Sequence, residues 1–324
     1  MTEVFGLIFR IGLLGSAAIA GFFCCAEASS QNVSASSAHA EPAQLQMNVD
    51  EVVVTFNAKD ANGFSVKDLK ASEVRIRDNG AAPRRLVAFD ELANRPIRVG
   101  ILLDESESAH ESLPVSRAIA RKFVERLFRQ RTDAAQILSF GYGSDVLRSW
   151  TGDPIELLQG IQSERNQQSA QKGTALFSAV FRACSLPLEG IDPTVTGNFI
   201  MLFSDGEDNA GLTRLEEAAR ACERTNTAVF AFLSTASPDR DSSGPKALRE
   251  LAEKTGGRLF HADDSDDSIW TDLQEIESEM RNQYRLVYNP AELKHDGAFH
   301  EIELQPPDRV SRVAVRSGYF APGH

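Results

Sequence analysis

Three oxygen-bearing side chains, at alternate positions, follow directly after an apolar segment of the chain. The segment is residues 99–103, and the side chains are those of Asp104, Ser106 and Ser108. A near-continuous apolar run is typical of a strand buried on both faces of a parallel sheet, and open sheets of this kind bind ligands at the carboxyl ends of their strands. Carboxylate and hydroxyl oxygens, without thiolate or imidazole, suit a hard cation such as Mg²⁺. The pattern therefore predicts a cation site at this strand end.

Two later residues fit the same site. Thr174 lies in a loop just before a predicted helix, and Asp205 ends a second apolar segment, residues 199–203, much as Asp104 ends the first. Short runs of Ser and Asp are also common in helix caps and turns, so a second interpretation stays open. In that interpretation the two serines cap the next helix and Asp205 sits in a tight turn.

The ordered set Asp-x-Ser-x-Ser, then Thr, then a strand-terminal Asp resembles the metal-ion-dependent adhesion site of von Willebrand factor type A (VWA) domains. Other segments are similar to a bacterial family of exported VWA proteins first described from acidobacteria: residues 52–63, 74–80, 283–288 and 316–319. The resemblance implies a Rossmann-like domain that binds Mg²⁺, or else Mn²⁺ or Ca²⁺. It also implies that an Asp or Glu side chain of a protein partner completes the coordination of the cation, which is the basis of adhesion in this family.

Position by position, the resemblance implies that the hydroxyls of Ser106, Ser108 and Thr174 are the inner ligands. Asp104 and Asp205 would supply charge and hold waters or the hydroxyls. Few formal charges would then touch the cation directly, which leaves it electrophilic toward a partner's carboxylate.

The chain departs from the family pattern at three positions. Glu107 and Lys172 stand where this exported family usually has Gly or another small residue, and Ser178 stands where an acidic residue commonly follows the Thr loop. The Glu107 carboxylate either points away from the site or crowds the metal and imitates a ligand. Glu207 and Asp208 add acid to the same rim, as solvated surface charge or as a second cation site.

Composition excludes some classes of function. The chain has 324 residues, of which 42% are hydrophobic and 25% charged, with a formal net charge of -12. These are ordinary values for a globular protein, and the acidic surface argues against nucleic acid and anionic lipid as partners. The sequence contains no Gly-x-Ser-x-Gly elbow, P-loop or Gly-x-Gly-x-x-Gly fingerprint, so we expect no enzymatic activity.

The N-terminus reads as an export signal. Arg10 precedes an apolar stretch, residues 11–23, that is too short to favour a spanning helix, and small residues allow cleavage after Ala28. We therefore predict a signal peptide over residues 1–28, with no membrane insertion after cleavage and a periplasmic or extracellular destination. Lipidation at Cys24 and an uncleaved anchor are the alternatives.

Two cysteines, Cys184 and Cys222, remain after signal cleavage, each near the end of a predicted helix. Export permits a disulfide, but two separate buried thiols are an equal possibility because the sequence does not show the distance between them. Residues 29–45 are polar, rich in Ser and Ala, and without periodicity, which predicts a disordered leader.

Residues 96–281 alternate strand and helix patterns, which predicts a doubly wound, mostly parallel α/β sheet covered on both faces. The predicted strands are residues 97–103, 135–140, 146–150, 199–203, 228–233 and 258–261, and the predicted helices are residues 114–131, 155–164, 176–185, 214–225, 246–255 and 268–282. Residues 46–95 and 282–324 alternate in the manner of half-buried antiparallel strands. We therefore predict an immunoglobulin-like β domain made from both chain ends, with the α/β domain inserted and its two junctions close together.

The function that this sequence favours is an exported, non-enzymatic protein-binding module that holds a divalent cation and, through it, an acidic side chain of a partner. A metal-free structural protein of the cell envelope is the first alternative. A metal-dependent hydrolase that uses Asp104 and Asp205 is the second, although no base, nucleophile or phosphate-binding cation is evident beside the strand ends.

Overall fold

The structure is a computed structural model that describes residues 51–163, 172–185, 196–234, 242–262, 265–292 and 294–322. The predicted signal peptide, residues 1–28, and the predicted leader, residues 29–45, lie outside the described residues. Of the helices in the described part of the chain, none combines the length and apolar character that crossing a membrane requires.

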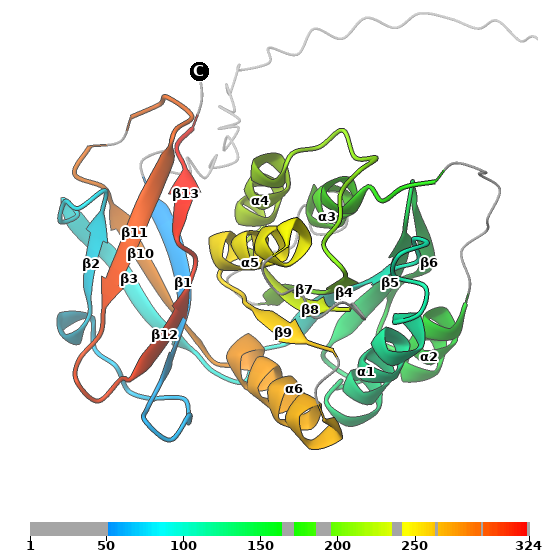
Figure 1. The fold of residues 1–324 in the computed structure, drawn as a ribbon. Helices are drawn as coiled ribbons and strands as arrows, with labels where there is room; N and C mark the ends of the chain where they lie inside the picture. The colour runs from blue at the N-terminus through cyan, green and yellow to red at the C-terminus, as the bar shows by residue number, and fades with distance from the viewer. Residues whose placement is uncertain are drawn as a thin grey trace, which may run out of the picture. The chain divides into compact units, whose positions relative to one another are not determined.

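A six-stranded sheet lies between two layers of helices (Figure 1). The strand order is β6-β5-β4-β7-β8-β9, and all neighbours are parallel except β6, which runs antiparallel to β5 at one edge. The strands are β4 (Ile97–Asp104), β5 (Ala134–Phe140), β6 (Ser144–Thr151), β7 (Gly197–Ser204), β8 (Thr227–Leu233) and β9 (Leu259–His261). This sheet confirms the predicted doubly wound α/β fold.

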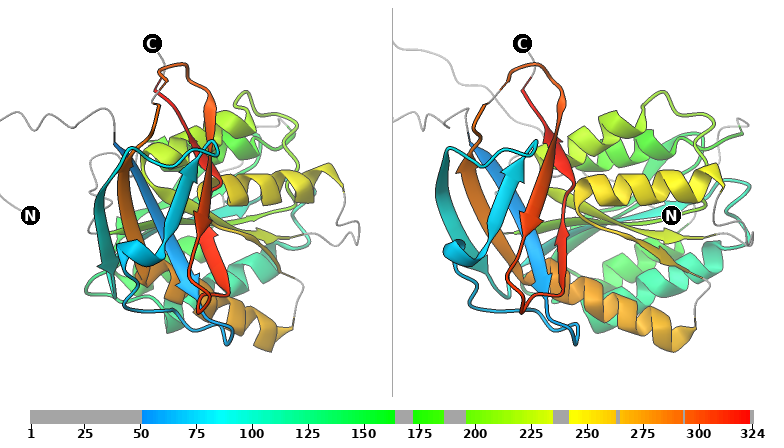
Figure 2. Two further views of the ribbon diagram at one scale, coloured as in Figure 1. Left: turned by 90° about the vertical axis from the view of Figure 1, so that its left-hand side faces the viewer. Right: turned by 60° about the vertical axis from the view of Figure 1, so that its left-hand side comes forward.

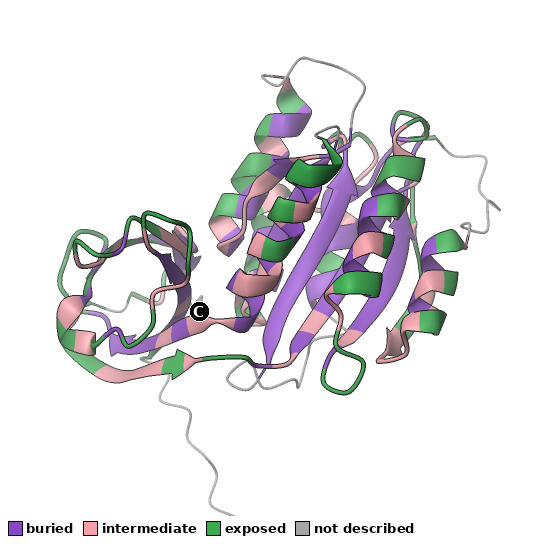
Figure 3. Ribbon diagram, turned by 90° about the horizontal axis from the view of Figure 1, so that it is seen from below, coloured by how far each residue is buried: buried purple, intermediate pink, exposed green. Residues whose placement is uncertain are grey.

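The central strands β4 and β7 are apolar along nearly their whole length because helices cover both faces of the sheet. Seen from below in Figure 3, buried strands lie behind helices whose residues alternate between buried and exposed. One apolar core packs α1, α2 and α6 on one face, and a second packs α3, α4 and α5 on the other. The helices are α1 (Leu113–Arg126), α2 (Pro154–Gln162), α3 (Leu176–Ser185), α4 (Leu215–Arg224), α5 (Ser243–Thr255) and α6 (Asp266–Arg281).

Helix α1 ends at Arg126, before the predicted residue 131. The Arg281 guanidinium donates to the carbonyl oxygen of Leu127 (3.1 Å), and the Asp133 carboxylate accepts the backbone N–H of Arg129 (2.7 Å). Arg281 and Asp133 also form a buried ion pair of 2.6 Å. These two side chains, one of them distant in sequence, satisfy backbone groups that a longer helix would have used, which the local apolar pattern does not reveal.

A disulfide joins Cys184 of α3 to Cys222 of α4, with the Cα atoms 4.8 Å apart. It decides the question that the sequence leaves open. The two cysteines are 38 residues apart, and closing a loop of that length stabilises the folded state by about 3 to 4 kcal/mol.

The remaining strands come from both ends of the described chain (Figure 2). They form a four-stranded sheet, β12-β1-β10-β3, and a three-stranded sheet, β13-β11-β2, whose paired strands are antiparallel. Their bounds are β1 (Val52–Lys59), β2 (Arg75–Asp78), β3 (Arg85–Leu92), β10 (Gln283–Asn289), β11 (Phe299–Gln305), β12 (Arg312–Val315) and β13 (Gly318–Phe320), with a 3-10 turn at Ala71–Glu73. Apolar side chains of both sheets share one core, which includes Phe56, Ile76 and Leu286.

The two points where the chain passes between the β strands and the α/β region lie together. The backbone N–H of Arg95 donates to the carbonyl oxygen of Arg281 (3.3 Å), and that of Asn94 donates to the side chain of Asn282 (3.3 Å). These contacts confirm the predicted closeness of the two junctions.

Candidate metal-binding site

Strands β4 and β7 are neighbours, with Leu103 opposite Phe203, so the residues that follow them meet at one edge of the sheet. The chain leaves β4 for α1 on one face and leaves β7 for α4 on the other (Figure 1). Adjacent parallel strands whose next helices lie on opposite faces leave a crevice at their carboxyl ends. The residues singled out in the sequence lie at this edge of the sheet.

Asp104, the last residue of β4, is buried beneath the site, with 3% of its surface exposed. One carboxylate oxygen accepts the backbone N–H of Ser106 (2.9 Å), and the other accepts the hydroxyl of Ser204 (2.6 Å). Burial raises the pKa of Asp104 to about 6, hydrogen bonds from the Ser204 side chain and from the side chain and backbone of Ser106 oppose this shift, and the nearby negative charge of Asp205 adds to it. The carboxylate is therefore held in place at an energetic cost that a neighbouring cation would reduce.

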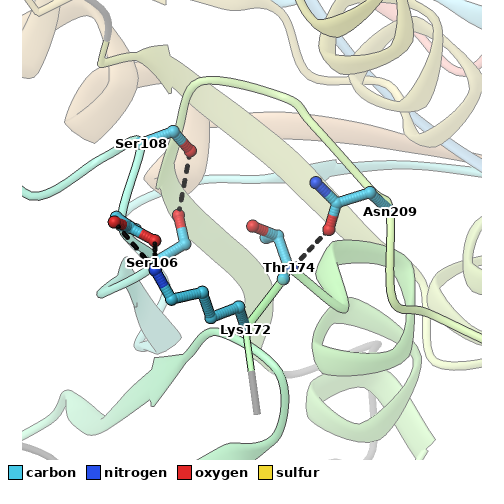
Figure 4. A pocket seen from close by; sticks show the side chains of 7 residues that line it. Ser106, Ser108, Lys172, Thr174 and Asn209 are labelled. Atoms are coloured by element: carbon cyan, nitrogen blue, oxygen red, sulfur yellow. Dashed lines mark hydrogen bonds and ion pairs between the residues drawn. The ribbon is translucent and has the colours of Figure 1, made fainter. Parts of the chain in front are cut away.

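The hydroxyls of Ser106 and Ser108 lie 3.3 Å apart in the loop after β4. Both residues line a hollow of about 390 Å³, together with Thr174 and Asn209 from two other loops (Figure 4). Ser106 is buried and Ser108 is exposed. Helix α1 begins much later, after the N-cap residue Ser112, so the interpretation of these serines as helix caps is wrong.

The backbone groups of Thr174 hold its loop in place. Thr174 N–H donates to the side-chain oxygen of Asn209 (2.8 Å), and the Thr174 carbonyl oxygen accepts the backbone N–H groups of Asn209 and Ala210 (3.1 and 2.9 Å). The preceding Gly173 has a φ of +122°, and a Cβ there would meet the Asn209 side chain at 2.8 Å. These contacts leave the buried Thr174 hydroxyl on the side of the loop that lines the hollow, as Figure 4 shows.

Asp205 follows β7 but is not among the residues that line the hollow. One of its carboxylate oxygens accepts the backbone N–H of Glu207 (3.0 Å), as in a tight turn. Gly206 has a φ of +87°, and a Cβ there would clash with the carbonyl oxygen of Gly244 at 2.2 Å. Asp205 therefore sits in a tight turn, as the second interpretation of the sequence predicts. Its negative charge still raises the pKa of Asp104.

Glu107 and Lys172, the two unusual residues, form an ion pair at the hollow. Lys172 Nζ lies 2.8 and 3.2 Å from the two carboxylate oxygens of Glu107, and both residues line the hollow with the hydroxyls. The lysine lowers the pKa of Glu107, and the glutamate raises the pKa of Lys172.

Three residues at this edge have roles that the sequence did not reveal. Ser204 bonds Asp104 and also accepts the backbone N–H of Gly206 (3.0 Å), and Asn209 holds Thr174. Asp208 accepts the backbone N–H groups of Leu176 and Phe177 at the start of α3, and burial raises its pKa. A serine at the end of an apolar strand was a detectable signal, but nothing in the sequence pairs the loop around Asp208 with α3.

The donor set at the hollow consists of hydroxyls with carboxylates behind them. Among the described residues, no three His, Cys, Asp or Glu side chains gather in a group that could hold a metal. Neutral hydroxyl oxygens with two nearby carboxylates are the kind of donors that a hard divalent cation accepts.

The sequence model of the von Willebrand factor type A domain matches residues 99–279, which run from within β4 to within α6. No curated protein matches the chain. Similar solved structures include the conserved hypothetical protein BatB from Bacteroides thetaiotaomicron (TM-score 0.43, 22% identity, 56% of this chain and 97% of that chain). The manganese-loaded TRAP protein of Plasmodium vivax (0.43, 14%, 71% and 96%) and the mussel byssus proximal thread matrix protein 1 with a zinc-occupied MIDAS motif (0.43, 15%, 58% and 48%) are also similar.

Proposed function

The chain belongs to the VWA domain family, since the match spans more than half of its residues, and we propose that it is a non-enzymatic protein-binding module. In this proposal Ser106, Ser108 and Thr174 hold a divalent cation directly, and Asp104 and Asp205 act behind them through charge and water. The partner is a protein or peptide that offers an Asp or Glu side chain.

The observation that carries the proposal is that three hydroxyls from two separate loops line one hollow above a buried carboxylate. Hydroxyl oxygens are neutral, so they compensate little of the positive charge of a bound cation. The cation would therefore stay electrophilic and accept a carboxylate in place of a water. Asp104 has two tasks: it fixes the Ser106 backbone, and it supplies the negative charge beneath the hydroxyls.

Mg²⁺ is the proposed cation, with Mn²⁺ and Ca²⁺ as alternatives. Mg²⁺ keeps several waters and uses few protein ligands, which suits a set of three hydroxyls better than Ca²⁺, whose sites commonly use six to eight oxygens. Because the pKa of buried Asp104 is raised to about 6 without metal, a cation would favour its charged form and so gain affinity as pH rises through this value.

We also propose that the protein is exported and that its β strands form a second domain. Residues 1–28 would direct export and be removed, residues 29–45 would form a leader, and the mature protein would stay outside the cytoplasm without membrane insertion. Residues 46–95 and 282–324 would form an immunoglobulin-like domain into which the VWA domain, residues 96–281, is inserted; the strand order of the two smaller sheets supports this. The segments quoted above support membership of the exported family described from acidobacteria.

A metal-free structural role is the second candidate, and the Glu107–Lys172 pair favours it. This pair lies at the hollow, so it places a carboxylate of the chain itself where a ligand would bind. A hydrolase is less well supported. Among the described residues that line the hollow, Glu107 and Lys172 are the charged ones, and they pair with each other rather than standing ready as base or phosphate ligand.

Thermal unfolding in Mg²⁺, Mn²⁺, Ca²⁺ or EDTA tests the proposal, with the variants Asp104→Ala and Ser106→Ala. A cation that binds only the native state adds about 2.7 kcal/mol at a hundredfold excess over its dissociation constant. We expect a metal-dependent rise in the midpoint that both variants lose, and that the control Asp308→Ala, an exposed aspartate outside the hollow, retains. If the unfolding midpoint of the wild-type protein does not change with metal, the metal-free role is favoured.

A further inference from the structure

The ion pair between Glu107 and Lys172 joins the two loops that carry the hydroxyls. Glu107 lies between Ser106 and Ser108 in the loop after β4, and Lys172 lies two residues before Thr174 in the loop that leads into α3. Figure 4 shows the Lys172 side chain reaching across from its own loop toward the serine loop. The pair therefore spans the hollow and does not lie on one side of it.

The ion pair between Glu107 and Lys172 is weak enough for another carboxylate to take the place of Glu107. The side chains are 76% exposed for Glu107 and 79% exposed for Lys172, and the pKa shift of each is caused first by its hydrogen bond to the other. Exposed ion pairs contribute little to stability because water and salt screen them and both long side chains lose freedom. A carboxylate supplied by a ligand would replace Glu107 on the lysine at small cost.

The charges around the hollow favour a ligand that replaces Glu107 as the partner of Lys172. Among the described residues that line the hollow, Lys172 is the only basic one, while the carboxylate of Asp104 lies beneath the hydroxyls and the charge of Asp205 acts on Asp104. A ligand that brings one carboxylate to the hydroxyls would still face the negative charge of Glu107. A ligand that brings two would displace Glu107 and keep the lysine paired, and the hollow of about 390 Å³ has room for roughly a dozen waters, hence for two carboxylates.

We propose that Lys172 is a second carboxylate-binding residue of this site and that Glu107 is the internal carboxylate that occupies it in the free protein. The inference rests on the proposed function and deepens it, because it names the partner as an acidic segment with two neighbouring carboxylates. One carboxylate faces the hydroxyls of Ser106, Ser108 and Thr174, and the second pairs with Lys172.

Two short peptides test this proposal, acetyl-Gly-Asp-Glu-Gly-amide and acetyl-Gly-Asp-Gln-Gly-amide, which differ by a single carboxylate. Each is titrated into the protein in Mg²⁺ and in EDTA and followed by NMR. The variants are Lys172→Met, Glu107→Gln and the control Lys122→Met, whose lysine pairs with Asp266 outside the hollow (3.2 Å). Calorimetric titration of Mg²⁺ into each protein, without peptide, reports the cation site separately.

We expect the wild-type protein to bind the two-carboxylate peptide about two- to fivefold more tightly, the range of one exposed ion pair. Glu107→Gln should increase affinity for that peptide by a similar factor. Lys172→Met should abolish the preference without weakening Mg²⁺ binding, because it removes a positive charge from the hollow. Lys122→Met should behave as wild type.

Equal binding of the two peptides by the wild-type protein would overturn the proposal. A loss of more than about tenfold in Mg²⁺ affinity in Glu107→Gln would overturn it as well, since one exposed charge beside the cation contributes less than that and Glu107 would then be a ligand of the cation. If the wild-type protein shows no calorimetric response to Mg²⁺, the proposed function fails before any peptide is added, and this inference fails with it. If the wild-type protein binds Mg²⁺ normally but binds the two peptides equally, the inference alone is refuted.

Discussion

Two aspartates, each the last residue of a strand and each buried, belong to clusters of opposite character. Asp104 ends β4 in the six-stranded sheet, and Asp78 ends β2 in the three-stranded sheet, with 3% and 6% of their surfaces exposed. Around Asp78 lies a group that we call the tyrosine cluster: Asp78, Tyr288, His300 and Tyr319. The comparison separates polar residues that stabilise a fold from polar residues that are available to a ligand.

In the tyrosine cluster the side chains form hydrogen bonds with one another. The hydroxyls of Tyr288 and Tyr319 both donate to one oxygen of Asp78 (2.8 Å each), and His300 Nδ1 lies 3.2 Å from the other. Burial, and then the Asp78 carboxylate, raise the pKa of both tyrosines, so their hydroxyls stay protonated as donors. A hollow of about 320 Å³ lies beside Asp78 and His300. Both oxygens of the Asp78 carboxylate already have hydrogen-bond partners within the cluster.

The Asp104 cluster differs because the hydroxyls that line its hollow come from loops, while Asp104 and Ser204 end strands β4 and β7. Asp104 also has hydrogen-bond partners, namely the backbone and side chain of Ser106 and the hydroxyl of Ser204. The residues Ser106, Ser108 and Thr174 nevertheless line an open hollow. Residues on strands are held by the ladder and close a network, whereas loop residues at a sheet edge present oxygens outward. We infer that the first arrangement stabilises and the second binds.

The largest expected effect is that of Asp78→Ala. Removal of the carboxylate leaves two buried tyrosine hydroxyls and a histidine without their acceptor, so the free energy of unfolding should fall by about 3 to 5 kcal/mol. Urea unfolding measures this value. The control Asp308→Ala, at an exposed turn, should stay within about 0.5 kcal/mol of wild type, and a similarly small loss for Asp78→Ala would contradict the structural role of the cluster.

Next in size is the pH dependence that Asp104 gives to the metal-free protein. Because its folded pKa of about 6 lies above the ordinary 3.8, the native state holds more protons than the unfolded state between these values. Stability in EDTA should therefore fall by about 3 kcal/mol as pH rises from 4 to beyond 6, through this group alone. Asp104→Asn should remove that fall, so urea unfolding at pH 4.5 and pH 7.5 should give a smaller difference than for wild type. Parallel pH profiles for the two proteins would show that Asp104 is not destabilised by burial.

A smaller effect is expected for Tyr319→Phe in the tyrosine cluster. The variant keeps the ring and removes one donor to Asp78, while Tyr288 and His300 remain, so the free energy of unfolding should drop by about 1 to 2 kcal/mol. Tyr142→Phe is the matched control, since Tyr142 is 40% exposed and should tolerate the same change within about 0.5 kcal/mol. Equal stability of both variants would remove Tyr319 from the stabilising group.

The smallest effect on stability is expected for Ser106→Ala. Its hydroxyl lies 3.3 Å from the Ser108 hydroxyl and also hydrogen-bonds the Asp104 carboxylate, whose bonds to the Ser106 backbone N–H and the Ser204 hydroxyl survive the change. In EDTA the variant should unfold within about 1 kcal/mol of wild type, yet it should lose the rise in midpoint that Mg²⁺ produces. A loss of more than 2 kcal/mol in EDTA would instead place Ser106 with the residues that stabilise the fold.

Local pattern sufficed for most of the elements. The apolar runs that end at Asp104 and Ser204 predicted β4 and β7, and period-2 alternation predicted strands at both chain ends. Helix α1 was predicted too long because its end depends on Arg281, which is distant in sequence and near in space. The roles of Ser204 and Asp208 were missed for the same reason, since each acts on a residue of another loop or strand.

What the sequence by itself determined is the chemistry at each strand end: apolar runs long enough to be buried on both faces, then hydroxyls and carboxylates with no soft ligand among them. Only the tertiary structure decided which ends meet. It set β4 beside β7, joined Cys184 to Cys222, and brought Lys172 across to Glu107. The reason is physical: local propensity acts within a few residues of the chain, whereas these pairings depend on how the sheet is ordered and on which loops its edge brings together.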